Sequence, residues 1–492
     1  MAATTVKLGN LPFSSPYFSI GKEECQNFYV ENSISDSSKV PYYYVSIPGL
    51  KIFVPRTSSK VCRGMFRTSN NKLFAVFGNL FQEILITGER ILRGTLTSYS
   101  GPISMADNTY QLCLVDSEFG YILDFESNTF SKIDPETFPN GASKVVCIDS
   151  YFITNYPNSN KYVWSKLNDG LVWDPLDFAT KEGQPDNIVS VEAHKNLLWV
   201  FGSWSTEIHY DTGDTATQVW QRYQSAIIDV GCQSPFSVAK IEDNIFWIGS
   251  DKSGNVAVWS NDGMNPKKIS TRGIEQLINH HVGLTGVDNA IGFTYSQAGH
   301  VFYVIQFTNS NLTLCYDVVT GAWHRRSSIS DRGDDAKWRA RWSSFIWGKN
   351  LFADDNGDAI YVADVDYYLN DLPEGGTRDI RRVRTTPILQ SNQKRIRHNW
   401  IQFIFEQGVG TVVNTANGTG RNPVAELWIS DDNGYSFKNR RTAELGAMGQ
   451  STFRTRWLGL GHSRNRCYKI IITEPVKIIL VGCVADMTEL GF

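Results

Sequence analysis

Short apolar runs separated by polar turns recur along the first 370 residues of the chain. One run, Leu73–Phe77, follows the turn residues Asn70–Lys72 and precedes a second polar turn. Runs of this length between Asn, Asp and Gly clusters are typical of β-strands. The repeats fall near residues 72, 110, 151, 196, 244, 300 and 350, with spacings of 38, 41, 45, 48, 56 and 50. The pattern predicts an all-β chain built from a degenerate repeat.

A repeat of about 40–50 residues made of strands is typical of a β-propeller. Each blade is a small antiparallel sheet that cannot bury both faces alone, so blades stack around a common axis. The seven repeats predict six or seven degenerate blades over residues 50–375. The chain has neither a Trp-Asp series nor a kelch Gly-Gly series, which leaves unrelated hairpins in stacked sandwiches as an alternative.

The two ends of the chain differ from this central repeat. Residues 1–49 are rich in Ser, Asn and Pro and show little periodicity, so we expect an extended N-terminal arm. After the turn signal Pro373–Gly376, short strands alternate basic and apolar residues, as in Arg381–Arg384. We therefore predict a separate β-sandwich-like C-terminal domain over residues 376–492. The one helix that the pattern favours is Thr271–His281, too short to change the all-β class.

Charge is distributed unevenly along the chain. Its 492 residues include 47 Lys and Arg against 50 Asp and Glu, a formal net charge of −3, with 41% apolar residues. This apolar content can form a core, and the balance lacks the basic excess of a dedicated nucleic-acid binder. Residues 376–492 nevertheless hold 17 basic and 9 acidic side chains, a net of +8, which leaves −11 for residues 1–375. Such asymmetry indicates association through complementary patches.

No segment approaches the about 18 unbroken apolar residues of a membrane helix, and residues 1–15 lack the apolar core of a secretory signal. We therefore expect no membrane contact and synthesis in the cytosol. The eight cysteines are scattered, with no C-x-x-C pair. In that compartment they are predicted to be free, buried thiols.

The motifs that commonly carry catalysis are missing. The chain contains no Gly-rich phosphate loop, no G-x-S-x-G and no H-E-x-x-H sequence. We predict no enzymatic activity and no cofactor, and we assign no catalytic, cofactor-binding or metal-binding residues. His280 and His281 would point about 100° apart on a helix, which disfavours a shared metal ion. The acidic segment Asp354–Asp358 is interpreted as a solvated turn, with a weak Ca²⁺ site as the alternative.

Two further segments have a recognisable local pattern. Ser430–Phe437 resembles the Asp-box hairpin of sialidase-like propellers, in which Asp caps backbone N–H groups and Gly adopts a positive φ. It is a turn without catalytic chemistry, but it keeps a carbohydrate-binding or glycan-cleaving propeller as the alternative function. Lys337–Trp342 alternates basic and apolar side chains, which predicts a half-buried strand with a charged outer face or, alternatively, a subunit interface.

Several phrases of the chain resemble one protein family. Gly21–Glu31, followed by Ile47–Leu50, is similar to the opening of the packaged-DNA-stabilisation proteins of short-tailed bacteriophages, also called tail hub or head-completion proteins. The resemblance continues through Trp164–Ala179 and is most characteristic over Gly183–Tyr210. It extends through Ile228–Asp251, and it covers residues 20–260 well and 260–370 loosely.

The resemblance implies a structural protein of the virion tail, assembled in the host cytoplasm. Such proteins form a ring, typically a hexamer, below the portal and its adaptor, where they stabilise packaged DNA. They also provide a docking surface for tailspikes or fibres and for the needle. DNA is expected to pass through the channel without sequence-specific binding. We hypothesise that the acidic residues 1–375 line this channel, because phosphate is repelled where Lys and Arg are absent.

Overall fold

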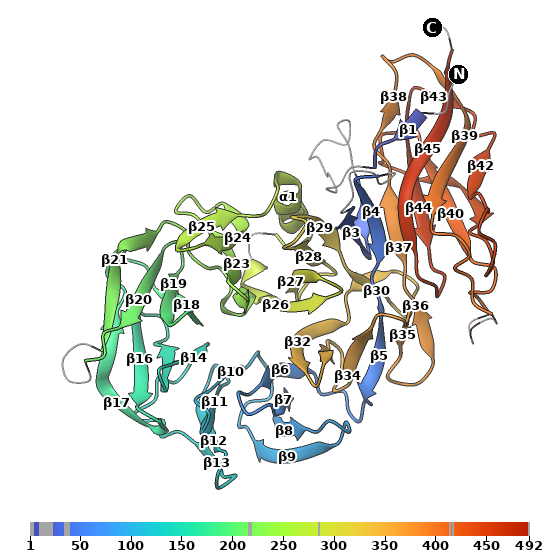
Figure 1. Cartoon of the computed structure of the whole chain (residues 1–492). Coiled ribbons are helices and arrows are strands. Elements are labelled where there is room, and N and C mark those ends of the chain that lie inside the picture. The colour runs from blue at the N-terminus through green and yellow to red at the C-terminus, as the bar shows by residue number, and fades with distance from the viewer. Residues whose placement is uncertain are drawn as a thin grey trace.

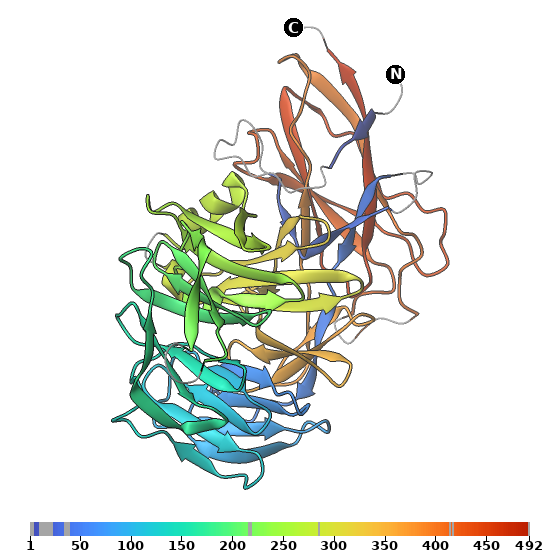
Figure 2. The ribbon, with the colours of Figure 1, turned by 60° about the vertical axis from the view of Figure 1, so that its left-hand side comes forward.

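Four-stranded antiparallel units follow one another around a central axis, and a two-layered domain stands beside the ring they form (Figure 1, Figure 2). The computed structural model describes residues 4–8, 23–33, 40–214, 219–283, 286–412, 415 and 418–490, without the side chains of residues 224–226. Within this part, the α-helix α1 (Arg272–His281) begins after its N-cap Thr271, as the sequence pattern predicts. No helix in the described ranges is long and apolar enough to cross a membrane.

The first five units of the ring are separate sheets. Their strands are β6 (Cys62–Arg67), β7 (Leu73–Phe77), β8 (Leu80–Ile84) and β9 (Arg90–Thr95); β10 (Ser104–Asp107), β11 (Gln111–Val115), β12 (Gly120–Asp124) and β13 (Phe130–Lys132); β14 (Val145–Ile148), β15 (Tyr151–Asn155), β16 (Lys161–Lys166) and β17 (Asp169–Thr180); β18 (Ile188–His194), β19 (Leu197–Gly202), β20 (Thr206–Asp211) and β21 (Trp220–Ile228); and β22 (Ala239–Ile241), β23 (Asn244–Ser250), β24 (Val256–Asp262) and β25 (Asn265–Lys268).

Two more units complete the ring. They are β26 (Ala290–Gln297), β27 (His300–Phe307), β28 (Thr313–Asp317) and β29 (Trp323–Arg325), and then β32 (Ala340–Ile346), β33 (Lys349–Asp354) and β34 (Ile360–Asp364) with β5 (Gly49–Val54). Short connecting elements are η1 (Pro235–Ser237), η2 (Val287–Asn289), the hairpin of β30 (Ser327–Ile329) and β31 (Asp335–Lys337), and the hairpin of β35 (Leu369–Asp371) and β36 (Thr377–Asp379).

The apolar runs that recur in the sequence form the second strand of each unit, namely β7, β11, β15, β19, β23, β27 and β33. All five residues of β7 and of β11 are buried, because a neighbouring unit covers each face. Seven apolar clusters lie between successive units, and one joins Ile346 of the last unit to Leu73 of the first. The prediction of an all-β propeller with six or seven blades is confirmed: six blades are separate four-stranded sheets, and β26–β29 belongs to a larger sheet.

A strand from the start of the chain closes the ring. β5 pairs antiparallel with β34 as the outer strand of the last blade. Its first residue, Gly49, donates its N–H to the carbonyl of Tyr367 at 2.6 Å. A Cβ atom at Gly49 would overlap the backbone of Leu369, so this approach of two chain segments requires glycine.

The C-terminal part of the chain forms a β-sandwich around one apolar core. One sheet contains β3 (Phe28–Asn32), β4 (Tyr42–Ser46), β45 (Ile479–Glu489), β39 (Ile396–Phe405) and β42 (Arg456–Leu458), with β1 (Thr4–Val6) on β45 and β43 (His462–Ser463) on β39. The other contains β2 (Cys25–Gln26), β37 (Arg382–Thr385), β44 (Asn465–Ile472), β40 (Val424–Ser430) and β41 (Lys438–Glu444), with β38 (Leu389–Gln390) on β44. Phe403 and Leu480 of the first sheet share a core with Leu427 and Ile470 of the second.

The described parts of residues 1–49 differ from the expected extended arm, because they are strands of this sandwich. In both ribbon views the blue N-terminal strands lie among the orange and red C-terminal ones (Figure 1, Figure 2). The basic strand predicted at Arg381–Arg384 is also more internal than its charge suggests. Arg384 is fully buried and donates to Glu23 and to the hydroxyl of Tyr44, each at 3.0 Å. The apolar faces of these N-terminal strands are covered by segments more than 300 residues away in the sequence.

One residue, Asn27, joins the propeller to the sandwich. It follows β2, which pairs with β29 on one side and β37 on the other and so merges the sixth blade with the sandwich in a ten-stranded sheet. Asn27 is fully buried with φ of 56°. Its side-chain amide donates to the carbonyl of Arg381 at 2.7 Å and accepts the N–H of Ser327 at 3.0 Å. Asn27 therefore satisfies backbone groups from both halves of the molecule.

A buried imidazole lies close to the same junction. His300 on β27 contacts Asp317 through Nδ1 at 2.8 Å and Glu31 of β3 through Nε2 at 2.7 Å. Burial alone lowers the pKa of His300, but hydrogen bonds and charges from Asp317 and Glu31 outweigh burial and raise that pKa above its ordinary value. The protonated ring can donate to both carboxylates at once.

We expect Asn27→Ala to lower the free energy of unfolding by about 3–5 kcal/mol, because buried backbone groups lose their partners. Urea unfolding followed by tryptophan fluorescence measures the change. The matched control is Asn128→Ala, since Asn128 is exposed but has a similar φ of 55°. The Asn128→Ala control should lower the free energy of unfolding by about 1 kcal/mol, because alanine adopts a positive φ less readily than asparagine. Equal losses in the two variants would show that the Asn27 side chain does not connect the two halves.

The stabilisation that His300 provides should decrease as the pH rises. Its folded-state pKa is raised, so the contribution is complete below the unfolded value of about 6.5 and disappears as the pH passes the folded value. The unfolding free energies of wild type and His300→Gln should therefore converge between pH 6 and pH 9. If the difference in unfolding free energy between the two proteins stayed constant or grew over this range, protonated His300 would not bridge Asp317 and Glu31.

Candidate functional site

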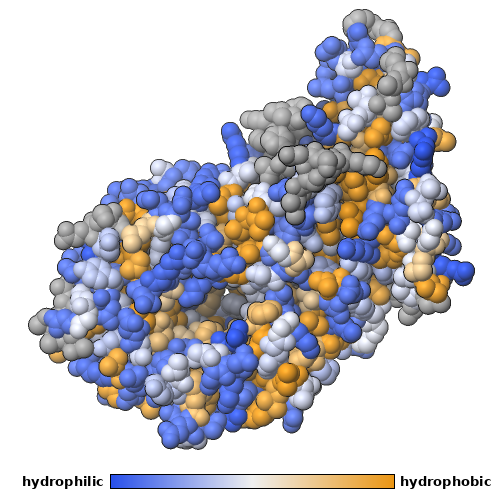
Figure 3. Space-filling view, in the orientation of Figure 1, coloured by the Kyte–Doolittle hydropathy of each residue, from blue (hydrophilic) through white to orange (hydrophobic). Residues whose placement is uncertain are grey.

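The inner strands of the propeller surround a hollow on the ring axis. The space-filling view shows that the face of the ring is hollowed at its centre (Figure 3). The cavity has a volume of about 340 Å³ and is lined by residues of β6, β10, β14, β18 and β22, together with Trp342 of β32. At about 30 Å³ per molecule, this space accommodates roughly ten waters. It is therefore a small axial cavity between blades.

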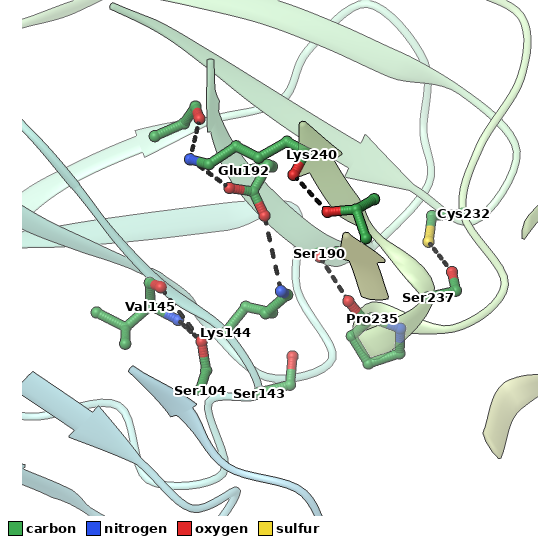
Figure 4. Close-up of polar contacts among 12 residues, drawn as sticks. Ser104, Ser143, Lys144, Val145, Ser190, Glu192, Cys232, Pro235, Ser237 and Lys240 are labelled. Atoms are coloured by element: carbon green, nitrogen blue, oxygen red, sulfur yellow. Dashed lines mark hydrogen bonds and ion pairs between the residues drawn. The ribbon is translucent and has the colours of Figure 1, made fainter. Parts of the chain in front are cut away.

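Three charged side chains from three successive blades meet in this cavity (Figure 4). Glu192 of β18 lies 3.6 Å from Nζ of Lys144, which precedes β14, and 3.0 Å from Nζ of Lys240 on β22. Burial raises the pKa of Glu192, but the positive charges of Lys240 and Lys144 lower that pKa by a larger amount. The net shift of the pKa is therefore downward. Lys240 also donates to the carbonyl of Ala193 at 2.6 Å. The carboxylate thus connects the third, fourth and fifth blades, which are neighbours in the ring.

The nucleophilic side chains in the cavity are not set up for catalysis. The Ser104 hydroxyl donates to the carbonyl of Val145 at 3.2 Å and accepts the N–H of the same residue at 3.1 Å. Burial raises the pKa of Cys147 to about 12, which keeps the thiol protonated at neutral pH. The axial groups connect neighbouring blades. No sequence motif marked them, although Lys144, Glu192 and Lys240 recur at intervals of 48 residues, close to the repeat length.

The segment that most resembles the phage family encloses a buried ion pair. Lys181 and Asp186 form this pair, and Lys181 Nζ also donates to the hydroxyl of Ser205 at 2.5 Å. Asp186 accepts the backbone N–H groups of Trp204 and Ser205, each at 3.0 Å. Nearby, a Cβ atom at Gly231 would overlap the backbone of Trp204. These residues hold the start of the fourth blade against its own β19–β20 turn.

A second buried chain of polar groups links the third and fourth blades. Glu207 of β20 accepts the N–H of Gly183 at 2.5 Å and contacts Nε2 of His209 at 3.1 Å. The other ring nitrogen of His209 is hydrogen-bonded to the hydroxyl of Tyr162 on β16 at 2.8 Å. Burial raises the pKa of Glu207, but His209 and the Gly183 N–H bring it below its ordinary value. A carboxylate–imidazole–phenol chain enclosed in this way positions blades and lies away from solvent.

The acidic segment Asp354–Asp358 is neither a solvated turn nor a metal-binding cluster. Asp354, Asp355 and Asp358 are buried and paired with cations, and the described residues contain no group of three or more ligands placed to hold a metal ion. Burial raises the pKa of Asp358, but hydrogen bonds from Thr57 and the Thr57 and Ser58 backbone lower it to about 2. The sequence shows the carboxylates but not the cations that neutralise them.

Those cations come largely from Lys337–Trp342, which is not the single strand predicted: β31 ends at Lys337 and β32 begins at Ala340. Lys337 lies 2.7 Å from Asp355, and Arg339 lies 2.9 Å from Asp354. Trp338 is buried on the opposite side, as the alternation predicts. The basic face that we expected to be charged and outward is therefore covered by the acidic segment of the same blade.

The Asp-box-like segment lies outside the propeller, in the loop between β40 and β41 of the sandwich. Asp432 accepts the hydroxyl of Ser430 at 2.6 Å and the N–H of Ser436 at 2.9 Å, and Gly434 donates to Ser430 at 2.8 Å. These hydrogen bonds lower the pKa of Asp432 to about 2. The segment is a structural turn, and its position removes the feature that suggested a sialidase-like propeller.

Removing the axial carboxylate should destabilise the ring. We expect Glu192→Gln to lower the free energy of unfolding by about 1–3 kcal/mol at pH 7, less than for a fully buried pair because Lys240 is half exposed. The folded-state pKa of Glu192 is lowered, so the stabilisation is present above about pH 4.3 and is lost as the pH falls through the folded value. Thermal unfolding at pH 7 and pH 3.5 tests this, with exposed Glu136→Gln as the control. Similar effects of the two substitutions at pH 7 would refute the axial link.

Comparison with known proteins gives one decisive result. A sequence model of the family described as bacteriophage P22 Gp10, β-propeller, matches residues 30–368. No curated protein matches the chain significantly. Among solved structures, the chain is similar to the computationally designed Ika8 protein, with 13% identity, a TM-score of 0.38, and coverage of 70% of this chain and 100% of that one. It is also similar to the N-terminal domain of Nup159, with 11% identity, a TM-score of 0.39, and coverage of 69% and 98%. Because the family match spans well over half of the chain, this protein belongs to the bacteriophage P22 Gp10 β-propeller family.

Proposed function

We propose that the protein is a non-enzymatic structural component of the phage tail. In this proposal, identical copies form a ring, expected to be a hexamer, below the portal and its adaptor. The ring stabilises packaged DNA and provides the docking surface for tailspikes or fibres and the needle. The observation that carries the proposal is the family match over residues 30–368, which includes all seven blades.

The physical character of the propeller supports a scaffolding role. Seven apolar clusters and the buried ion pairs between blades make the ring a rigid disc with two broad faces. A rigid surface binds with little loss of conformational entropy, which favours docking of several partners. The side chains on the axis are paired with one another and are not arranged around a reacting group.

In this proposal, DNA does not cross the disc through the axial cavity. A volume of about 340 Å³ is that of a small-molecule pocket, and Lys144 and Lys240 as well as Glu192 line it. A DNA channel in the proposed assembly therefore lies between copies, along the surfaces that they turn toward a common axis. The hypothesis of an acidic channel lining applies to that shared surface.

The proposal predicts that particles lacking this protein package DNA but do not retain it. Phage with a nonsense mutation in the gene for this protein would be grown on suppressing and on non-suppressing hosts. The amount of nuclease-resistant DNA per particle would then be measured. We expect a severalfold loss in the absence of the protein and recovery when the purified chain is added to unfinished particles. Full DNA retention without the protein would overturn the proposed role in stabilisation.

A further inference from the structure

The outer strand of the third blade carries several exposed apolar side chains, of which Phe178 is contacted by a charged neighbour, Lys161, 4.4 Å from the ring centre. β17 ends its sheet, and its outer backbone edge pairs with no strand among the described residues. Four of its large apolar side chains are exposed, Leu176 most of all at 82%. The others are Leu171, Val172 and Phe178. Several exposed apolar residues on one edge strand are consistent with a contact with another protein surface.

This surface is held in shape by its own strand. Trp173 is buried beneath it and donates its indole N–H to the carbonyl of Gly170 at 2.8 Å. Next to Trp173 the pairing of β16 with β17 is irregular, and the Asp174 carboxylate accepts the N–H of Leu176 at 3.0 Å. The turn projects Leu176 away from the blade. Projection from a fixed turn reduces the entropy lost when the side chain is buried in a contact.

Acidic residues surround these apolar side chains. Asp169, Asp174 and Asp177 lie on β17, and Glu182 follows the strand. Lys166 on β16 contacts Asp177 at 2.7 Å and Asp174 at 3.8 Å, and so neutralises part of this charge. The β17 surface is therefore apolar at its centre and acidic at its border.

The far side of the molecule carries an edge of opposite charge. β41 is the last strand of the second sandwich sheet, and six of its seven residues are exposed. Lys438, Arg440 and Arg441 supply positive charge there, which Glu426, paired with Arg440 at 2.5 Å, and Glu444 at the end of the strand reduce only in part. Arg441 donates to the carbonyl of Leu458, whose side chain is 63% exposed, so the basic edge also has an apolar neighbour. In Figure 1, β17 lies at the left edge of the ring, and β40 and β42, the neighbours of β41, lie at the far right.

We propose that the β17 surface of one copy of this chain docks against the β41 edge of the next copy. The inference rests on the proposed ring and names the two surfaces that form it. Two different surfaces on opposite sides of one chain make a heterologous contact, which repeats from copy to copy and closes when the rotation per copy divides the circle. The occupant is a second copy because its basic, partly apolar edge complements the acidic, apolar surface.

The first test places a charge at the centre of the β17 surface. Leu176→Glu should weaken association between copies at least about tenfold, because buried apolar anchors dominate interfaces. Leu92→Glu is the matched control, since Leu92 is 57% exposed on β9, the outer strand of another blade. Mass photometry and light scattering over a range of concentrations measure association, and thermal unfolding confirms that both variants fold. Loss of the ring in both variants, or in neither, would overturn the inference.

The second test asks directly whether the two surfaces meet. Leu176→Cys combined with Leu458→Cys should give a ladder of disulfide-linked oligomers under mild oxidation, whereas Leu92→Cys with Leu458→Cys should not. The eight native cysteines are free, and seven of them are buried, so their background is expected to be low. A wild-type ring without specific crosslinking would refute this interface and leave the proposed function standing. A wild-type chain that stays monomeric alone and with portal and adaptor would refute the ring itself.

Discussion

The described residues 25–33 and 40–54 contribute strands to both halves of the molecule, and this double use constrains the whole fold. Strands β2, β3 and β4 complete the sandwich, and β5 closes the last blade. Between them Asn27 ties the sixth blade to β37 through buried hydrogen bonds. Contacts between segments more than 300 residues apart carry a large loop-closure cost, which is recovered only when ring and sandwich form together. Propeller and sandwich are therefore joined through a shared sheet as well as through the chain.

Apolar packing closes the ring, and buried charges determine how its blades align. The apolar clusters between blades supply most of the driving force, but that force is non-directional. Hydrogen-bonded ion pairs need defined geometry, and each buried network joins particular strands. Glu192 links three blades at the axis, and Glu207 with His209 links the third and fourth. Lys181 and Asp186 form a further buried network within Gly183–Tyr210 and the residues before it, where Asp186 also accepts the N–H of Ser205.

A disc of this kind keeps its shape through contacts inside and between its blades. Its charged side chains are largely used inside: the acidic segment at Asp354 neutralises the basic segment at Arg339, and Arg384 is enclosed within the sandwich. The formal charge asymmetry therefore overstates the surface contrast between the two halves. The charged side chains that stay exposed form small groups, with acidic residues around Leu176 and basic residues on β41. In the axial cavity, the ion pairs of Glu192 with Lys144 and Lys240 connect neighbouring blades.

The repeated strands, the all-β class and the helix near Thr271 could be predicted from the amino-acid sequence, because they depend on local patterns. A strand buried on both faces must be apolar throughout, so Leu73–Phe77 and its six counterparts were visible without a structure. An alternating segment such as Lys337–Trp342 shows which side is polar but not what covers it. Only the tertiary structure decided that Asp354 and Asp355 cover that segment, that residues near Phe28 join the sandwich, and that Lys144, Glu192 and Lys240 meet on the axis. These contacts join segments that are distant in the chain, and their formation depends on strand register and ring closure, which no local pattern encodes.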